Sequence, residues 1–366
     1  MSKYRKIIYG LPRRQYSGIK QTEDILIGRM REAGVEAMEF FYFGSFSDDD
    51  STFFRIFSRS WDLVRFMWRC CVYRPDIVHF NTSFDRKSVT RDVFFAVAAR
   101  MLFVKFVMKV HGSDKNFLNN MTLPWKTLGW ICIFAANKVC IGTYVEREEF
   151  LSNSNFKEDK FVVMKNAVDI SEFNKLDEDA KYFSSKEKDL PVILYLSRIM
   201  KEKGAFDLLE AIPDVLEKRK ANFYFGGFGK ERNKLAEMIK EKKLERYVHM
   251  LPVLSDEEVK RIYHFCDMFV FPTRCAEGIP ISLLNALVCG VPIVTTKFRF
   301  SMDYLQEPDN CLFVEIGDPN SLADKIVYLI DRSALRSKMS ENNKRLALGF
   351  DKNIVVRDYL ALYGIL

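Results

Sequence analysis

The stretch Glu277-Gly278-Ile279-Pro280 decides the fold, together with the apolar segment 281–290 and Val291-Pro292-Ile293-Val294-Thr295-Thr296 that follow it. An apolar run at 268–271 precedes this stretch and has the length of a buried strand. Gly278 permits a positive φ, and Pro280 suits the first turn of a helix. The segment therefore predicts strand, turn, helix and strand, with one carboxylate at the turn.

Glu277 lies in the predicted loop that connects a parallel strand to the helix after it. Ligands of open α/β sheets bind outside the carboxyl ends of the strands. We therefore interpret Glu277 as a residue for recognition or chemistry. The alternative is an ordinary solvated carboxylate in a loop.

The length of 366 residues favours two domains, each large enough to have its own core. The longest apolar stretch, 94–110, is interrupted by Arg100, Lys105 and Lys109, so no segment reaches the roughly 20 apolar residues of a spanning helix. The apolar run near the N-terminus is too short for a signal-peptide core, which favours a cytosolic protein. Eight cysteines occur without a Cys-x-x-Cys pair, so we expect reduced thiols rather than zinc ligands or disulfides.

Charge is distributed unequally along the chain. Residues 1–170 hold 26 Lys and Arg against 19 Asp and Glu, whereas 171–366 hold 30 of each, so the net charge of +7 lies in the first part. A basic face there favours anionic lipid or a phosphorylated acceptor as partner. Nucleic acid is not expected, because no known nucleic-acid module is present.

Both parts of the chain alternate strand-like and helix-like segments. In the first part these are 6–9, 20–33, 37–43, 53–73, 77–80, 91–102 and 105–110. The second alternation begins at 192–196 and runs to the helical stretches 321–330 and 334–348. Alternation of this kind predicts α/β domains with parallel sheets. We expect an N-terminal domain at 1–172, a linker at 173–190 and a C-terminal domain at 191–350.

Two cations follow the first strand of the second part. Arg198 and Lys203 lie five residues apart, just before a helix at 205. Fixed positive charge beside the free N–H groups of a helix start favours a diphosphate. The alternative is a solvated charge run.

Three further features of the first part have both a functional and a structural interpretation. Gly18 opens a helix after a strand and would let the backbone approach a ligand closely, although a lone glycine is a weak signal. His111 follows a strand and precedes Gly112, so it could bond a substrate hydroxyl, and a satisfied core histidine is the equal alternative. Asp48-Asp49-Asp50 is expected to be a solvated loop rather than a metal site, because no His or Cys lies near it.

The chain resembles the retaining glycosyltransferases of the GT-B fold, family 4 type, through motifs in that family's order. These are Pro75-Asp76-Ile77-Val78-His79, Val110-His111-Gly112, Asn166-Ala167-Val168-Asp169 with Phe173, Ser197-Arg198 with Glu202-Lys203-Gly204, Gly226-Gly227-Phe228-Gly229, Asp267 to Thr273, Glu277-Gly278-Ile279-Pro280 and Gly317-Asp318-Pro319. The resemblance implies an α/β fold of two Rossmann-like, doubly wound domains facing across a cleft. It also implies that a final helix, 351–366, joins the N-terminal domain.

The resemblance implies a UDP- or GDP-sugar donor and no cofactor or metal. By position, Arg198 and Lys203 would bind the diphosphate and Gly18 would approach it. Glu277, with Gly278, Ile279 and Pro280, would bind the sugar, and His111 would contact it near the reacting centre. The family usually has a second glutamate, for the nucleotide ribose, where this chain has Asn285. That departure predicts a weaker, uncharged ribose contact.

The predicted function is retaining transfer of a sugar from a nucleotide-sugar donor to a saccharide acceptor. Arginines alternate with large apolar residues over 53–73, which suits a helix on an anionic membrane surface, although a helix that only covers the sheet remains the alternative. We therefore expect a lipid-linked acceptor in bacterial surface polysaccharide synthesis and a cytoplasmic protein at the inner membrane face. Candidate acceptor residues are Arg13, Arg14, Tyr16 and Lys115. Competing hypotheses are a nucleotide-sugar epimerase, a phosphorylase, or a degenerate protein that serves as a partner subunit.

Overall fold

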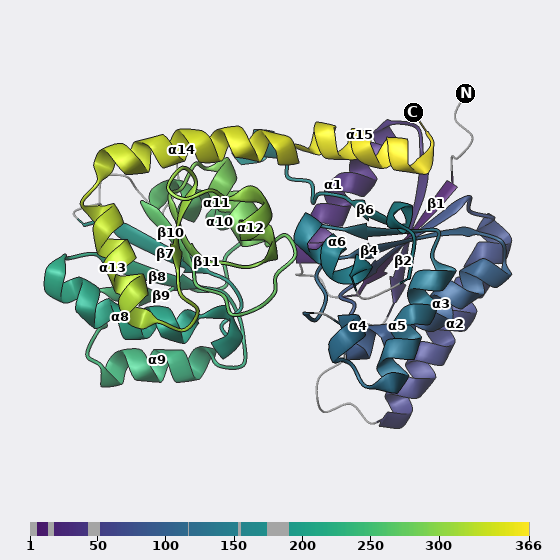
Figure 1. Cartoon of the computed structure of the whole chain (residues 1–366), viewed down its shortest axis with the longest axis horizontal. Helices are drawn as coiled ribbons and strands as arrows, with labels where there is room; N and C mark the ends of the chain where they lie inside the picture. Colours follow the sequence, from purple (N-terminus) through teal and green to yellow (C-terminus); the bar gives the residue numbers. More distant parts are fainter. Residues whose placement is uncertain are drawn as a thin grey trace. The chain divides into compact units, whose positions relative to one another are not determined.

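The structure is a computed structural model of the chain, and it describes residues 6–13, 18–42, 52–115, 117–152, 155–173 and 190–365 (Figure 1). These residues divide into two compact units. Unit 1 comprises 1–168, 276–279 and 350–366, and unit 2 comprises 169–275 and 280–349. Each unit is described by itself below. The loop 276–279 thus belongs to unit 1, although the sequence around it continues in unit 2.

Unit 1 contains a six-stranded parallel sheet in the order β2-β1-β3-β4-β5-β6. Its elements are β1 (Lys6–Pro12), α1 (Gly18–Glu32), β2 (Glu36–Tyr42), α2 (Thr52–Tyr73), β3 (Ile77–Thr82), α3 (Arg86–Met101), β4 (Lys105–Val110), α4 (Phe117–Asn120), α5 (Leu123–Ala135), β5 (Lys138–Ile141), α6 (Tyr144–Leu151), β6 (Phe161–Val163) and α15 (Lys352–Tyr363).

Helices cover both faces of this sheet. Apolar side chains of α2, α3 and α5, among them Phe66, Phe95 and Ile133, form a core on one face. The other face is covered by α1 and α15, with Leu26 and Tyr359 in its core, and Figure 1 shows these two helices side by side. A parallel sheet needs this double cover because its strands are apolar on both sides.

Unit 2 contains a second six-stranded parallel sheet, in the order β12-β11-β10-β7-β8-β9. Its elements are α7 (Ile170–Phe173), β7 (Val192–Leu196), α8 (Ala205–Lys218), β8 (Asn222–Gly226), α9 (Arg232–Glu241), β9 (Val248–Met250), α10 (Asp256–Phe265), β10 (Met268–Phe271), α11 (Ile281–Val288), β11 (Ile293–Thr296), α12 (Arg299–Tyr304), β12 (Cys311–Val314), α13 (Pro319–Ile330) and α14 (Ser333–Ala347). Numbered within the unit, the order is 3-2-1-4-5-6, that of a dinucleotide-binding sheet.

Two parallel six-stranded sheets with helices on both faces confirm the predicted α/β class. All eight cysteines are free, and five of them are buried: Cys70, Cys132, Cys140, Cys266 and Cys311. One helix begins earlier than the sequence indicated: α3 starts at Arg86 because the Asp85 side chain accepts a hydrogen bond from the Ser88 N–H and caps it. The acidic run 48–50 and the residues 174–189 of the expected linker lie outside the described residues.

A glycine holds two loops of unit 2 against each other. Ser197 N–H donates to Gly226 O, and Ile199 N–H donates to Phe228 O. Gly227 has φ +125°, and a Cβ there would lie 1.9 Å from Ser197 O. Only glycine fits this close approach without moving the loop that carries Arg198.

We predict that Gly227→Ala destabilises the protein by more than about 1 kcal/mol, because both the backbone angle and the contact with Ser197 oppose a side chain. Gly28→Ala is the matched control: Gly28 lies in α1 with nothing within 4 Å of its Cβ position, so it should be neutral or slightly stabilising. Urea unfolding of the two variants measures the difference. Equal midpoints would contradict the close-approach argument.

Candidate functional site

The candidate residues of unit 2 lie at the switch point of its sheet. The strand order reverses between β7 and β10, and ligands of doubly wound folds bind at the carboxyl ends of the strands there. Ser197-Arg198 directly follows β7, and the segment leading to Glu277 follows β10. The structure therefore brings the predicted diphosphate residues to the edge where this fold binds nucleotides.

Arg198 and Lys203 differ in their surroundings. Arg198 is exposed, and its guanidinium makes no ion pair or hydrogen bond within the described part of the chain. Lys203 is buried and is the last residue of a 3₁₀ turn, Lys201–Lys203. Gly204, with φ +78°, connects this turn to the start of α8. The Tyr195 hydroxyl donates to the carbonyl oxygens of both Arg198 and Lys203, at 3.2 Å each. One buried tyrosine thus fixes the loop between the two cations.

Asn285 lies on α11, one turn into the helix that follows Pro280. Its side chain is only 4% exposed, and its Oδ1 has no hydrogen-bond partner among the described residues. A buried carbonyl oxygen without a partner is unfavourable by about 1–3 kcal/mol. Asn285 can therefore accept a hydrogen bond from a ligand hydroxyl.

In unit 1, the loop 276–279 packs on His111 and Gly112. A Cβ on Gly278 would lie 3.1 Å from His111 O, and one on Gly112 would lie 3.5 Å from Gly278 N. The Asn166 amide donates to Ile279 O at 3.2 Å and anchors the loop from the other side. The structure therefore places Glu277, which is half-buried, beside the loop of His111 in the same unit.

His111 follows β4 and is nearly buried, with 7% of its side chain exposed. Its Nε2 lies 2.6 Å from Asn81 Oδ1, on β3. Burial, together with the nearby charge of Lys109, lowers the pKa of His111 to about 3, so the ring is neutral at pH 7. A neutral imidazole can both donate and accept a hydrogen bond.

The remaining candidates of unit 1 lie in loops after strands. Gly18 is the exposed first residue of α1, and Arg13 is exposed just after β1, where its N–H donates to Tyr42 O. Lys115 is exposed, and its carbonyl accepts from the Asn120 amide. Arg14 and Tyr16 lie outside the described residues. Because Arg13 and Lys115 follow β1 and β4, both lie at the edge of the sheet that carries His111.

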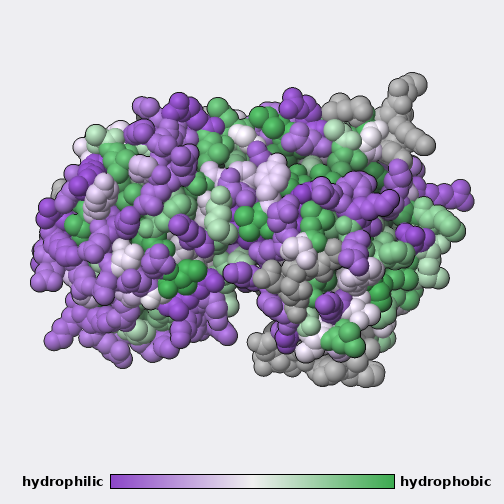
Figure 2. All heavy atoms as spheres, in the orientation of Figure 1, coloured by the Kyte–Doolittle hydropathy of each residue, from purple (hydrophilic) through white to green (hydrophobic). Residues whose placement is uncertain are grey.

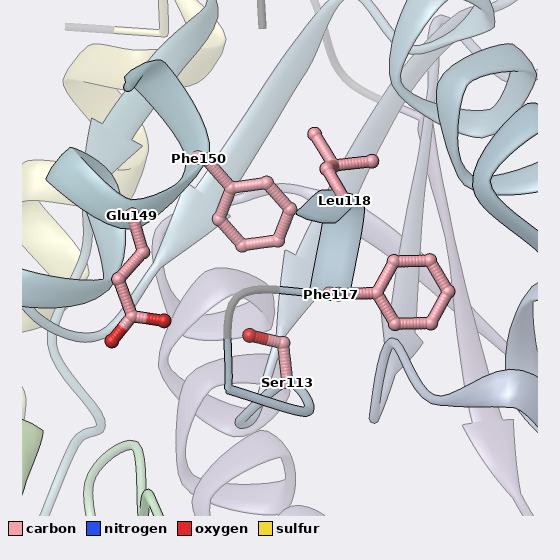
Figure 3. Close-up of a pocket in the computed structure, with 5 residues that line it drawn as sticks. All are labelled: Ser113, Phe117, Leu118, Glu149 and Phe150. Atoms are coloured by element: carbon pink, nitrogen blue, oxygen red, sulfur yellow. The ribbon is translucent and has the colours of Figure 1, made fainter. Parts of the chain in front are cut away.

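A shallow hollow lies beyond His111, between the loop of Ser113, α4 and α6 (Figure 3). It is lined by Ser113, Phe117, Leu118, Glu149 and Phe150, and its empty space is about 160 Å³ with open solvent included. Small-molecule sites usually have about 300–1,000 Å³. The hollow alone is too small for a nucleotide sugar.

A buried set of polar residues behind His111 was not predicted from the sequence. Glu23 of α1, His79 and Asn81 of β3, and Lys109 of β4 are all nearly inaccessible to solvent. Lys109 Nζ donates to Glu23 Oε1 at 2.7 Å. The signal that could have revealed them is Lys109, a charged residue inside the apolar strand 105–110, because a buried charge requires a partner.

No group of three or more His, Cys, Asp or Glu side chains in the described ranges is arranged to hold a metal ion. Among the helices that the structure describes, none is long and apolar enough to cross a membrane.

Two six-stranded doubly wound units define the GT-B type of two-domain fold. A family model, "Glycosyl transferases group 1", matches residues 177–346, which make up most of unit 2. This part of the chain belongs to the family, as the motifs predicted.

A relative from Campylobacter jejuni, N,N'-diacetylbacillosaminyl-diphospho-undecaprenol alpha-1,3-N-acetylgalactosaminyltransferase, is 29% identical over 59% of this chain. The match spans 57% of that protein, little more than half its length. Other relatives are named for capsular polysaccharide and colanic acid biosynthesis and for poly(ribitol-phosphate) glycosylation.

Two solved structures share the fold over nearly the whole chain. A glycosyltransferase from Rickettsia africae has a TM-score of 0.80 with 19% identity, covering 99% of this chain and 98% of its own. Anabaena HepE in complex with UDP and glucose has a TM-score of 0.77 with 15% identity, covering 99% and 100%.

Because His111 is buried, we expect the free energy of unfolding to depend on pH. In the unfolded chain a histidine takes up a proton below about pH 6.5, whereas folded His111 stays neutral until about pH 3. Stability should therefore fall as pH drops through this window, and His111→Gln should remove as much as about 1.4 kcal/mol per pH unit of that fall. Urea unfolding at several pH values from 8 to 4.5 measures it. Parallel curves for the two proteins would contradict a neutral, buried His111.

Proposed function

We propose that the protein is a retaining glycosyltransferase that moves a sugar from a nucleotide-sugar donor to a saccharide acceptor. The observation that carries the proposal is the exposed Arg198 guanidinium, without a partner among the described residues, on the same loop as buried Lys203 at the switch point of a Rossmann-type sheet. An arginine fork and a lysine next to free N–H groups at a helix start favour a diphosphate.

In this proposal Asn285 accepts a hydrogen bond from the nucleotide ribose. Its buried Oδ1 lacks a partner, and a ribose hydroxyl would satisfy it. The contact has no charge, which distinguishes this chain from relatives with a glutamate there. Since HepE is described with UDP and glucose, we propose a UDP-sugar as donor.

The proposed transfer breaks the bond between the anomeric carbon and the diphosphate oxygen and forms a bond from the same face to the acceptor hydroxyl. The acceptor proton passes to the departing phosphate. Arg198 and Lys203 stabilise the negative charge that develops on that phosphate, so they act more strongly in the transition state than in the ground state. Glu277 and His111 hold the sugar while its anomeric carbon gains positive charge.

Arg198→Ala and Lys203→Ala should each lower kcat/KM by about 100-fold or more, because each removes charge from the leaving diphosphate. Lys201→Ala is the matched control, since Lys201 is an exposed lysine of the same 3₁₀ turn. Release of UDP from a panel of UDP-sugars, with lipid extract as acceptor source, measures the rates. Wild-type rates in both Arg198→Ala and Lys203→Ala would refute the proposal that these residues bind the diphosphate.

We further propose a lipid-linked saccharide acceptor, as the name of the Campylobacter relative describes for that protein, and a place at the inner face of a bacterial membrane. A stripe on α2 supports this. Its exposed apolar side chains recur every three or four residues: Phe57, Trp61, Val64, Trp68 and Val72. The opposite side of the helix buries Phe66 and Cys70 in the core. Helix α2 therefore covers the sheet and also presents a second apolar face to solvent.

The apolar stripe continues over the neighbouring helices α3 and α5. Both expose large side chains, namely Phe94, Val97, Met101, Leu123, Trp130, Ile131 and Phe134, and Phe103 after α3 is 96% exposed. Figure 2 shows green atoms gathered over this side of unit 1. We call the exposed apolar residues of α2, α3 and α5 the aromatic face.

The exposed charges within the three helices of the aromatic face are of one sign. Within α2 from residue 57, α3 and α5, the acidic residues are Asp62 and Asp92, and both are buried, while half-buried Asp85 caps the start of α3. The exposed or half-buried charges there are basic: Arg59, Arg65, Arg69, Arg86, Lys87, Arg91, Arg100 and Lys126. Arg69 and Arg100 also lie over the rings of Trp68 and Phe134. Large apolar residues ringed by cations suit an anionic lipid surface.

Wild-type protein should float with vesicles that contain phosphatidylglycerol and much less with phosphatidylcholine vesicles. The double variant Trp61→Glu and Trp68→Glu should lose most of this binding, because it places two carboxylates in the aromatic face. Val253→Glu, at an exposed valine of unit 2, is the control and should float like wild type. Equal flotation of all three proteins, or no preference for anionic vesicles, would refute the membrane proposal.

A further inference from the structure

A set of buried polar side chains lies beneath His111, and we call it the His111 cluster: Glu23, His79, Asn81, Lys109 and Tyr363. Each member is at most 3% exposed. Glu23 Oε1 accepts from Lys109 Nζ at 2.7 Å and lies 3.9 Å from His111 Nε2, and its Oε2 lies 3.3 Å from His79 Nε2. The other ring nitrogen of His79 lies 2.5 Å from the Tyr363 hydroxyl on α15. The cluster therefore links α1, two strands and the last helix to one candidate residue.

Asn81 determines how the His111 ring is held. Its Nδ2 donates to Gly10 O at 3.0 Å, which leaves Oδ1 as the atom that faces His111 Nε2 at 2.6 Å. An amide oxygen only accepts, so His111 must carry its hydrogen on Nε2. The backbone of Asn81 is fixed as well, because its carbonyl accepts from the buried Tyr42 hydroxyl at 2.7 Å.

The charges around the ring keep it neutral. Burial and the ammonium of Lys109 disfavour the imidazolium, and Glu23 opposes them. Burial raises the pKa of Glu23, whereas Lys109 and His79 lower it by more, so the pKa lies well below its usual range. Glu23 is therefore a carboxylate that pairs with Lys109. Further titratable groups beside the cluster are Tyr9 of β1, Cys140 of β5 and Tyr359 of α15, and burial raises the pKa of all three. The loop of Glu277 packs on the backbone of His111, where a Cβ on Gly278 would lie 3.1 Å from His111 O.

We propose that Asn81 is a positioning residue of the transfer reaction. It fixes His111 as the neutral ring with hydrogen on Nε2, so that Nδ1 is the nitrogen left to accept a hydrogen bond from a hydroxyl of the donor sugar. The Glu23–Lys109 pair neutralises the underside of the ring and keeps the carboxylate from competing for the Nε2 hydrogen. This inference rests on the proposed function in taking a sugar as the ligand of His111.

The tautomer is tested without any substrate. The chain has four histidines, so ¹⁵N-histidine NMR of the whole protein resolves a small set of rings, which His111→Gln assigns. Wild-type His111 should show a protonated Nε2 and an unprotonated Nδ1, unchanged from about pH 8 to about pH 5.5. A ring with hydrogen on Nδ1, or one that titrates in this range, would overturn the proposal. The NMR result does not depend on turnover of a donor. Failure of the tautomer proposal can therefore be distinguished from failure of the proposed function.

Asn81→Asp tests the positioning role. A carboxylate at this position favours the imidazolium, so His111 should now titrate near neutral pH. The value of kcat should fall by about 10- to 100-fold with a smaller change in donor KM, and its pH profile should gain a new step. Asn343→Asp is the matched control, because Asn343 is a fully buried asparagine of unit 2 that donates to Val291 O. It should leave the His111 signals and the pH profile unchanged.

If Asn81→Asp fails to fold, Asn81→Ala is the second variant. It removes the acceptor without adding charge, so the His111 signals should broaden or show both tautomers, and kcat should again fall more than KM changes. Folded Asn81 variants with wild-type kcat and an unchanged pH profile would overturn the positioning role.

Discussion

Everything in this molecule depends on one constraint: parallel strands place their carboxyl ends at the same edge of a sheet. Each six-stranded sheet is fully parallel, so the loops that follow β1 and β4 in unit 1, and those that follow β7, β8 and β10 in unit 2, emerge at one edge of their own sheet. Residues far apart in the sequence meet there for that reason. Arg198 and the glycine loop 226–229 are one example, and His111 and Asn81 are another.

The regular elements were largely predictable from the sequence because their patterns are local. The strands at 192–196 and 268–271 have the predicted bounds, since a continuous apolar run defines each of them. The region 117–163 was not assigned. Helix α5 is apolar nearly all round, so it shows no period, and β5 is a run of only four residues. A short apolar run cannot be divided into helix and strand by periodicity alone.

The residues of the candidate site were also only partly predictable from the sequence. Sequence motifs pointed to Arg198, Lys203, Glu277 and His111, because each follows a strand, and their roles remain predictions. Glu23 and Asn81 were missed because their importance arises only from packing. Glu23 lies 86 residues from Lys109, and Asn81 lies 30 residues from His111. Neither pairing is visible before the order β1-β3-β4 is known, and a lone Glu in an amphipathic helix resembles many surface residues.

In the proposed function, unit 2 binds a nucleoside diphosphate through Arg198 and Lys203. Thermal unfolding of the whole chain with UDP, GDP, UDP-sugars and inorganic phosphate tests it most directly, because a ligand of the native state raises the melting temperature as RT ln(1 + [L]/Kd) requires. We expect a selective shift with one diphosphate series that disappears in Arg198→Ala and persists in Lys201→Ala. No shift with any nucleotide at millimolar concentration, or a shift that Arg198→Ala retains, would contradict it.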